Sequence, residues 1–142
     1  MKTRYKIRLA KKEDFSQLHN VLANALLNEK NLSSTCDLFE LSMHSFLREK
    51  ISLGNMIVIE DETQNLRMVG EVHYYHTSLQ EEKAVKEINF FPASSEYCEN
   101  SRENELYSWL YSEIKNRHRD VFSIKVKQPF TEPIYWLNPA FN

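Results

Sequence analysis

Glycine is scarce in this sequence. The 142 residues contain two glycines, Gly54 and Gly70, where an average usage of about 7% would give roughly ten. Phosphate-binding loops of the GxxxxGK[ST] and GxGxxG kinds need several glycines close together, because side chains would keep the backbone away from the phosphates. The shortage therefore excludes both kinds of nucleotide-binding loop.

Cysteine and long apolar runs are also lacking. The two cysteines, Cys36 and Cys98, lie far apart without a CxxC pair, so the sequence predicts neither a zinc ribbon nor a disulfide framework. No stretch approaches the 18 or so apolar residues of a membrane span, and the first residues contain no apolar run typical of a signal peptide. We therefore expect a cytoplasmic, thiol-reduced protein with no membrane partner.

Neither sign of charge dominates. Eighteen Lys and Arg residues against twenty Asp and Glu residues give a net charge of -2, and the pI is about 6.2. Nucleic-acid-binding domains are more often basic, so we expect no nucleic-acid partner. The composition is 42% hydrophobic and 12% aromatic, which is typical of a globular protein. The length predicts one domain, residues 1–142.

The spacing of apolar residues predicts an α+β fold. Alternation at period two predicts strands, and spacing near 3.6 predicts helices. The first expected elements are a strand at 5–9, a helix from 15 capped by Asp14, and a polar break at 28–34. A second helix is expected from Ser34 or Thr35, closed by Gly54 and Asn55, followed by strands at 56–60, 66–76 and 84–91. A helix at 101–117, a strand at 121–127 and an irregular tail at 128–142 complete the order. This order predicts a mostly antiparallel mixed sheet flanked by helices.

The element order and the opening segment Tyr5-Lys6-Ile7-Arg8-Leu9-Ala10 resemble those of the GCN5-related N-acetyltransferase (GNAT) family. Members open with such a strand and a capped helix, and Lys11-Lys12-Glu13-Asp14-Phe15 matches that opening. The resemblance covers most of residues 3–127. It implies a single GNAT-like domain that takes an acyl group from acetyl-CoA and transfers it to an amine of a small molecule or a protein.

In that family an R/Q-x-x-G-x-G/A loop at the start of the third helix holds the CoA pyrophosphate with backbone N–H groups. The best register places Arg102 at the first position, Glu105 at the first glycine and Tyr107 at the last. The cofactor-binding residues that the resemblance implies are Arg102, Asn104, Glu105, Leu106 and Tyr107. The sequence departs from the motif, because both glycine positions carry side chains and Glu103 and Glu105 add negative charge where the anion would lie.

Acyl transfer to an amine needs a base that takes a proton from the ammonium. On the strand Gly70–His76, alternation places Glu71, His73 and Tyr75 on one face. Glu87, on the next expected strand, is placed to reach the same face. Glu71 and Glu87 are therefore candidate general bases, and solvated or salt-bridged carboxylates are the alternative.

A third catalytic candidate lies near the end of the sequence. The fragment Ile134-Tyr135-Trp136, followed by Phe141, resembles the "fYxxxGF" segment of the GNAT family. The resemblance implies that Tyr135 serves as general acid, although Asn138-Pro139-Ala140 replaces the usual spacing and glycine. A tyrosine that serves only in packing is the alternative.

The histidines and cysteines do not predict a metal site. His73 and His76 lie three residues apart on an expected strand, so their side chains point to opposite faces. Cys98 precedes the expected third helix, whose N-terminus would favour a thiolate. A reactive thiol and an ordinary loop cysteine both remain open for Cys98.

The expected strand at 121–127 has an open edge if the tail is irregular. An uncovered edge invites pairing, so we expect either that the proline-rich tail covers it or that two chains form a homodimer there.

Three interpretations follow. The first is an acyl-CoA-dependent N-acyltransferase with an altered cofactor loop. The second is a GNAT-like domain without cofactor binding that acts as a binding or interaction module, which the missing glycines favour. The third is a different α+β fold, such as a cone-shaped sheet around a ligand pocket, which would show no splay between the fourth and fifth strands.

Overall fold

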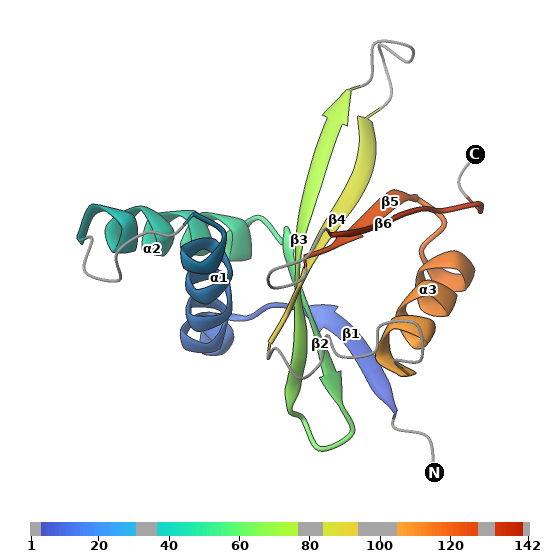
Figure 1. The fold of residues 1–142 in the computed structure, drawn as a ribbon, viewed down its shortest axis with the longest axis horizontal. Helices are drawn as coiled ribbons and strands as arrows, with labels where there is room; N and C mark the ends of the chain where they lie inside the picture. The colour runs from blue at the N-terminus through green and yellow to red at the C-terminus, as the bar shows by residue number, and fades with distance from the viewer. Residues whose placement is uncertain (1–3, 31–36, 77–83, 94–104, 128–132, 141–142) are drawn as a thin grey trace.

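The computed structural model describes residues 4–30, 37–76, 84–93, 105–127 and 133–140. They form one six-stranded sheet with helices on both faces (Figure 1). The helices are η1 (Lys12–Asp14), α1 (Phe15–Lys30), α2 (Asp37–Ser52) and α3 (Glu105–Arg117). The strands are β1 (Tyr5–Leu9), β2 (Met56–Asp61), β3 (Leu66–His76), β4 (Ala84–Pro92), β5 (Val121–Val126) and β6 (Ile134–Leu137). The predicted α+β fold is confirmed.

The strands lie in the sheet in chain order, from β1 to β6. Every neighbouring pair is antiparallel except β4 and β5, which are parallel. A parallel pair needs a crossover connection, and here the crossover contains α3. Because α3 runs back along the sheet, it begins at the end of the sheet where β4 and β5 finish.

Each face of the sheet has its own apolar core, and Figure 1 shows α3 on one side and α1 with α2 on the other. We call these the α3 face and the α1/α2 face. The core of the α3 face includes Ile57, Ile59, Met68, Val72, Ile88, Phe90, Leu106, Tyr107, Leu110, Ile114, Ile124 and Val126. The core of the α1/α2 face includes Leu18, Leu22, Met43, Leu47, Met56, Val58, Val69 and Phe91. Alternation along each strand therefore assigns its remaining residues to one face or the other.

Both glycines meet demands of the backbone or of packing. A Cβ atom on Gly70 would lie 2.7 Å from Cγ1 of Ile57 and 2.9 Å from Cε1 of Phe90, so only glycine allows this close approach on the α3 face. Gly54 has a φ of 74° just after α2, and the N–H of Asn55 donates to the carbonyl of Lys50. The predicted closure of the second helix at Gly54 and Asn55 is confirmed.

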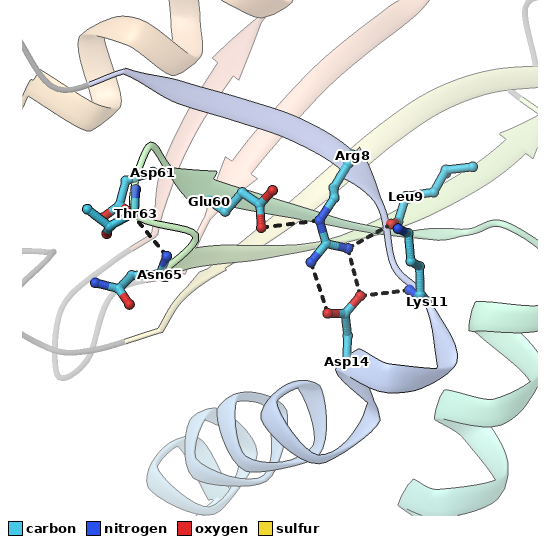
Figure 2. Close-up of polar contacts among 8 residues, drawn as sticks. All are labelled: Arg8, Leu9, Lys11, Asp14, Glu60, Asp61, Thr63 and Asn65. Carbon is cyan, nitrogen blue, oxygen red and sulfur yellow. Dashed lines mark hydrogen bonds and ion pairs between the residues drawn. The ribbon is translucent and has the colours of Figure 1, made fainter.

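An ion-pair network fixes the start of α1 against the sheet (Figure 2). Arg8 of β1 pairs with both carboxylate oxygens of Asp14, at 2.7 and 2.9 Å, and its Nε lies 3.2 Å from Oε2 of Glu60 in β2. Asp14 also accepts the backbone N–H of Lys11 at 2.7 Å. These bonds from Arg8 and Lys11 lower the pKa of Asp14. The prediction that Asp14 caps the N–H groups of the following turn is corrected: Asp14 binds the backbone before it, because Arg8 holds its carboxylate on that side.

Three sequence expectations on element boundaries need correction or stay open. The expectation that a polar break begins at residue 28 is wrong, because α1 continues through Lys30. Residues 31–36 and 101–104, including the expected start of the third helix, lie outside the described residues. The tail expected to be irregular contains β6, which pairs antiparallel with β5 from Val126↔Ile134 to Ser123↔Leu137. The tail therefore covers the edge of β5, which confirms the first of the two expectations for this edge.

Candidate functional site

Glu71 and Glu87 lie on the same face of the sheet. Glu71 follows the core residue Val69 at a spacing of two and reaches Lys50 of α2, so it belongs to the α1/α2 face. Glu87 pairs in register with His73, the next residue of β3 on that face. The prediction that Glu71 and His73 share a face and that Glu87 reaches it is confirmed, whereas the side chain of Tyr75 lies outside the described residues.

These residues belong to two rows that cross the sheet on the α1/α2 face. Strand register gives the first row as His73, Glu87, Ser123 and Leu137. The second row is Glu71, Asn89, Lys125 and Tyr135. We call the polar members of the two rows the acceptor belt. The belt differs from the apolar core of the same face, so it is the candidate site.

Glu71 has two cationic or protonatable neighbours. Its Oε1 lies 2.8 Å from Nε2 of His73 and 3.8 Å from Nζ of Lys50, and Glu71 is 9% exposed. Such a buried carboxylate is stabilised by pairing. Glu71 therefore fits the salt-bridged alternative that the sequence left open, and it holds His73 in place.

Glu87 has a different environment on the neighbouring strand. The buried hydroxyl of Ser123 donates a 2.7 Å hydrogen bond to its Oε2. This bond crosses the parallel β4–β5 pair and orients the carboxylate on the α1/α2 face. Glu87 is thus a half-buried carboxylate whose Oε2 accepts a hydrogen bond from a neutral donor.

Asn89 and Lys125 complete the middle of the second row. Asn89 Oδ1 is buried without a hydrogen-bond partner. Lys125 lies beside it on β5, half-buried, with the core residues Ile124 and Val126 pointing to the opposite face. A buried amide oxygen without a partner costs stability unless something binds it.

Tyr135 lies at the outer end of the belt. Ile134 and Trp136 pack against the core of the α3 face, so Tyr135 and Leu137 point to the α1/α2 face. They are 54% and 55% exposed. Tyr135 therefore shares a face with Glu71 and Glu87.

The belt lies beside the point where β4 and β5 part. Their register ends at Phe90↔Val126, and the N–H of Lys127 donates the last bond to the carbonyl of Phe90. β4 continues to Pro92 with β3 alone. Asn89 and Lys125 form the pair just before the last pair of this register, so the belt reaches its end.

The candidate cofactor-binding residues lie around the start of α3, at the same end of β4 and β5. Arg102 and Asn104, like Cys98, lie outside the described residues. Glu105 is exposed at the first turn of α3, whereas Leu106 and Tyr107 are 3% and 1% exposed in the core of the α3 face. Any contact of Leu106 or Tyr107 with an anion would therefore use backbone N–H groups.

The sequence did not single out Ser123, Asn89 or Lys125. Alternation along 121–127 assigns Ser123 and Lys125 to one face, but it does not say which strands lie on either side of them. Only the register of β4, β5 and β6 brings these residues beside Glu87 and Tyr135.

The described part of the chain contains neither a metal-binding cluster nor a helix that could span a membrane. No group of three or more His, Cys, Asp or Glu residues there could hold a metal ion. None of its helices is both long enough and apolar enough to cross a membrane.

Solved structures of several acetyltransferases are similar to this chain. A predicted acetyltransferase with acetyl-CoA from Clostridium acetobutylicum is similar over 89% of this chain and 82% of its own, with 14% identity and a TM-score of 0.58. A possible acetyltransferase from Clostridium difficile matches over 87% and 78%, with 12% identity and a TM-score of 0.58. A GNAT-family acetyltransferase from Listeria monocytogenes matches over 86% and 75%, with 14% identity and a TM-score of 0.51. No family model and no curated protein matches the sequence.

The chain therefore has the fold of the GNAT acetyltransferases, as its element order predicted. The third interpretation, a different α+β fold, is wrong, because the acetyltransferase structures are similar over 86–89% of this chain.

Proposed function

We propose that the protein is an acyl-CoA-dependent N-acyltransferase that acetylates an amine on the acceptor belt. The observation that carries the proposal is the pair of carboxylates, Glu71 and Glu87, on one face of the sheet near the end of the β4–β5 register. The fold supports it, since solved acetyltransferases share it, among them one with acetyl-CoA. Fold alone does not fix activity, so the belt carries the argument.

Glu87 is the general base of this proposal. Its carboxylate takes a proton from the acceptor ammonium and so frees the nitrogen lone pair, while Ser123 holds Oε2 in place. When bound, an acyl-CoA supplies the acyl group as a thioester, and transfer to the nitrogen forms an amide and breaks the C–S bond. Tyr135, the exposed phenol of the belt, donates a proton to the leaving sulfur. Glu71 fixes His73 beside the acceptor nitrogen.

The start of α3 would hold the acyl donor. The positive end of the helix dipole lies at the first turn, which contains Glu105, and attracts an anion. The side chain of Glu105 is exposed, so it can turn toward solvent. We propose that Arg102 and Asn104 add contacts from the segment before α3, as the resemblance implies.

Acetyl transfer from acetyl-CoA to a panel of amines tests this function, with release of the CoA thiol and the mass of the product as readouts. Glu87→Gln is expected to lower kcat/KM by about 100-fold or more, because the amide cannot accept the proton. Glu62→Gln, at an exposed carboxylate in the turn after β2, is the matched control and leaves the rate unchanged. Equal rates for the wild type and Glu87→Gln would contradict the role of Glu87.

One observation favours a second function. Side chains stand at both glycine positions of the cofactor motif, which suits a GNAT-like domain that binds a partner without acyl-CoA. In that case the protein releases no thiol with any amine of the panel, and the belt serves as a binding surface.

A further inference from the structure

His73 of β3 is a histidine anchored by a buried carboxylate. Its Nε2 lies 2.8 Å from Oε1 of Glu71, two residues earlier on the same strand, and Glu71 is 9% exposed. Among the histidine side chains that the structure describes, His73 is the one with a carboxylate within 4 Å. His19 of α1 and His44 of α2 instead pack ring against ring, with their centroids 4.7 Å apart. We call Glu71 and His73 the dyad.

The anchor decides which ring nitrogen of His73 can accept a proton. Nε2 donates its hydrogen to Glu71 whether the ring is neutral or charged, because an ionised carboxylate can only accept. The proton that the ring gains and loses is therefore the one on Nδ1. Within the described part of the chain, Nδ1 has no hydrogen-bond partner, and the side chain is 37% exposed. Water can therefore reach the ring.

The charged groups around the dyad keep it in place. Nζ of Lys50 lies 3.8 Å from the same oxygen of Glu71, so this carboxylate is held from α2 as well as from β3. Glu87 of β4 pairs in register with His73, which places a second carboxylate on the same face of the neighbouring strand. A positive charge that forms on the ring of His73 therefore meets carboxylates along its own strand and across the sheet.

We propose that the dyad gives the protein a second activity, the hydrolysis of an acyl thioester by water when no amine is present. Nδ1 of His73 takes a proton from a water molecule while the water oxygen bonds to the acyl carbon. The C–S bond then breaks and the proton passes to the leaving sulfur, so a carboxylic acid and a thiol form. Glu71 is a positioning residue that orients the ring and stabilises its charged form. The inference rests on the proposed function for the place of the thioester on the belt.

Release of thiol and acetate from acetyl-CoA in an amine-free buffer tests the proposal. S-acetyl-N-acetylcysteamine is the second probe, because it carries the same thioester without the pyrophosphate. The wild type is expected to hydrolyse both probes faster than protein-free solution, and His73→Ala lowers the rate by about 100-fold. Glu71→Gln lowers kcat by about tenfold and leaves KM unchanged, because the amide can still accept from Nε2 but lacks the charge.

Added imidazole separates a catalytic loss from a structural one. It can occupy the space that the ring leaves in His73→Ala, so it is expected to restore part of the hydrolysis after the protein-free rate is subtracted. His118→Ala, at a half-buried histidine just after α3, is the control. It keeps the wild-type rate and gains nothing from imidazole.

Mass analysis of the products with an amine present distinguishes hydrolysis from acyl transfer. An amide that forms with an amine, without hydrolysis in its absence, overturns the second activity and leaves the acyltransferase standing. Hydrolysis that depends on His73, with no amide from any amine, supports the dyad and overturns the acyltransferase. Hydrolysis that His73→Ala retains overturns the role of the dyad. Neither an amide nor hydrolysis of either probe overturns both activities.

Discussion

At the scale of single residues, neighbours decide which carboxylates are structural and which can react. Asp61, at the end of β2, accepts hydrogen bonds from the hydroxyl and the N–H of Thr63 and the N–H of Asn65 and pairs with Arg67 at 2.8 Å. These donors lower its pKa to about 2, with the Thr63 hydroxyl as the largest cause. Glu87 accepts a hydrogen bond from the hydroxyl of Ser123. The first arrangement closes a hairpin, and in the proposed function the second orients a base.

The lowered pKa of Asp61 predicts how the free energy of unfolding depends on pH. Its pKa is about 2 in the folded chain against an ordinary value of 3.8. The lower value means that Asp61 stabilises the fold fully above pH 4 and loses this contribution as the pH falls toward 2. Asp61→Asn is expected to lower the free energy of unfolding by about 1–3 kcal/mol near pH 6, and by much less near pH 2.

Urea unfolding followed by circular dichroism at a series of pH values measures this difference. Glu62→Gln, at the exposed residue that follows Asp61, is the control, and its free energy of unfolding is expected to match that of the wild type at every pH. A gap between the wild type and Asp61→Asn that stays constant from pH 6 to pH 2 would disprove the assignment.

At the scale of elements, β6 sets the outer limit of the acceptor belt. It places Tyr135 beside Lys125 and covers the edge of β5. Asn138 fixes its end, because its amide donates to the carbonyls of His118 and Val121 at 3.2 and 2.9 Å and its N–H donates to Phe122. Without this anchor the four-residue strand has little to hold it, since short strands are weak alone.

Asn138→Ala is expected to loosen β6. The two carbonyls lose their donor, which lowers the free energy of unfolding by about 1–3 kcal/mol. A loosened β6 also uncovers the edge of β5, so self-association rises with concentration relative to the wild type. Chemical unfolding and sedimentation velocity measure the two effects. Asn116→Ala, at an exposed asparagine of α3, is the control, and an Asn138→Ala protein as stable and dispersed as the control would refute the anchor.

The sequence predicts most elements because their apolar period is local. Strands such as 66–76 show alternation within their own residues, and the structure keeps those bounds for β3. β6 escaped prediction because four residues among prolines carry too short a pattern, and its stability comes from pairing with β5. Ser123 and Lys125 were missed for a related reason: their role depends on which strands lie beside β5.

At the scale of the whole molecule, the two faces of the sheet differ in what covers them. The α3 face is filled by its core, while the α1/α2 face is covered by helices over only part of its length (Figure 1). The α1/α2 face also carries Glu71, Glu87, Lys125 and Tyr135 on neighbouring strands. In the proposed function, an acyl donor at the start of α3 and an amine on the acceptor belt meet near the end of the β4–β5 register.

The measurement that tests this account most directly is calorimetric titration of the wild-type protein with acetyl-CoA, with Glu105→Gly as a comparison. The account predicts binding in the micromolar range by the wild type, because the positive end of the α3 helix dipole attracts the anion while Glu105 turns to solvent. Binding by Glu105→Gly alone would show that the glutamate closes the cofactor site. No binding by either protein would contradict the acyltransferase and favour the interaction module.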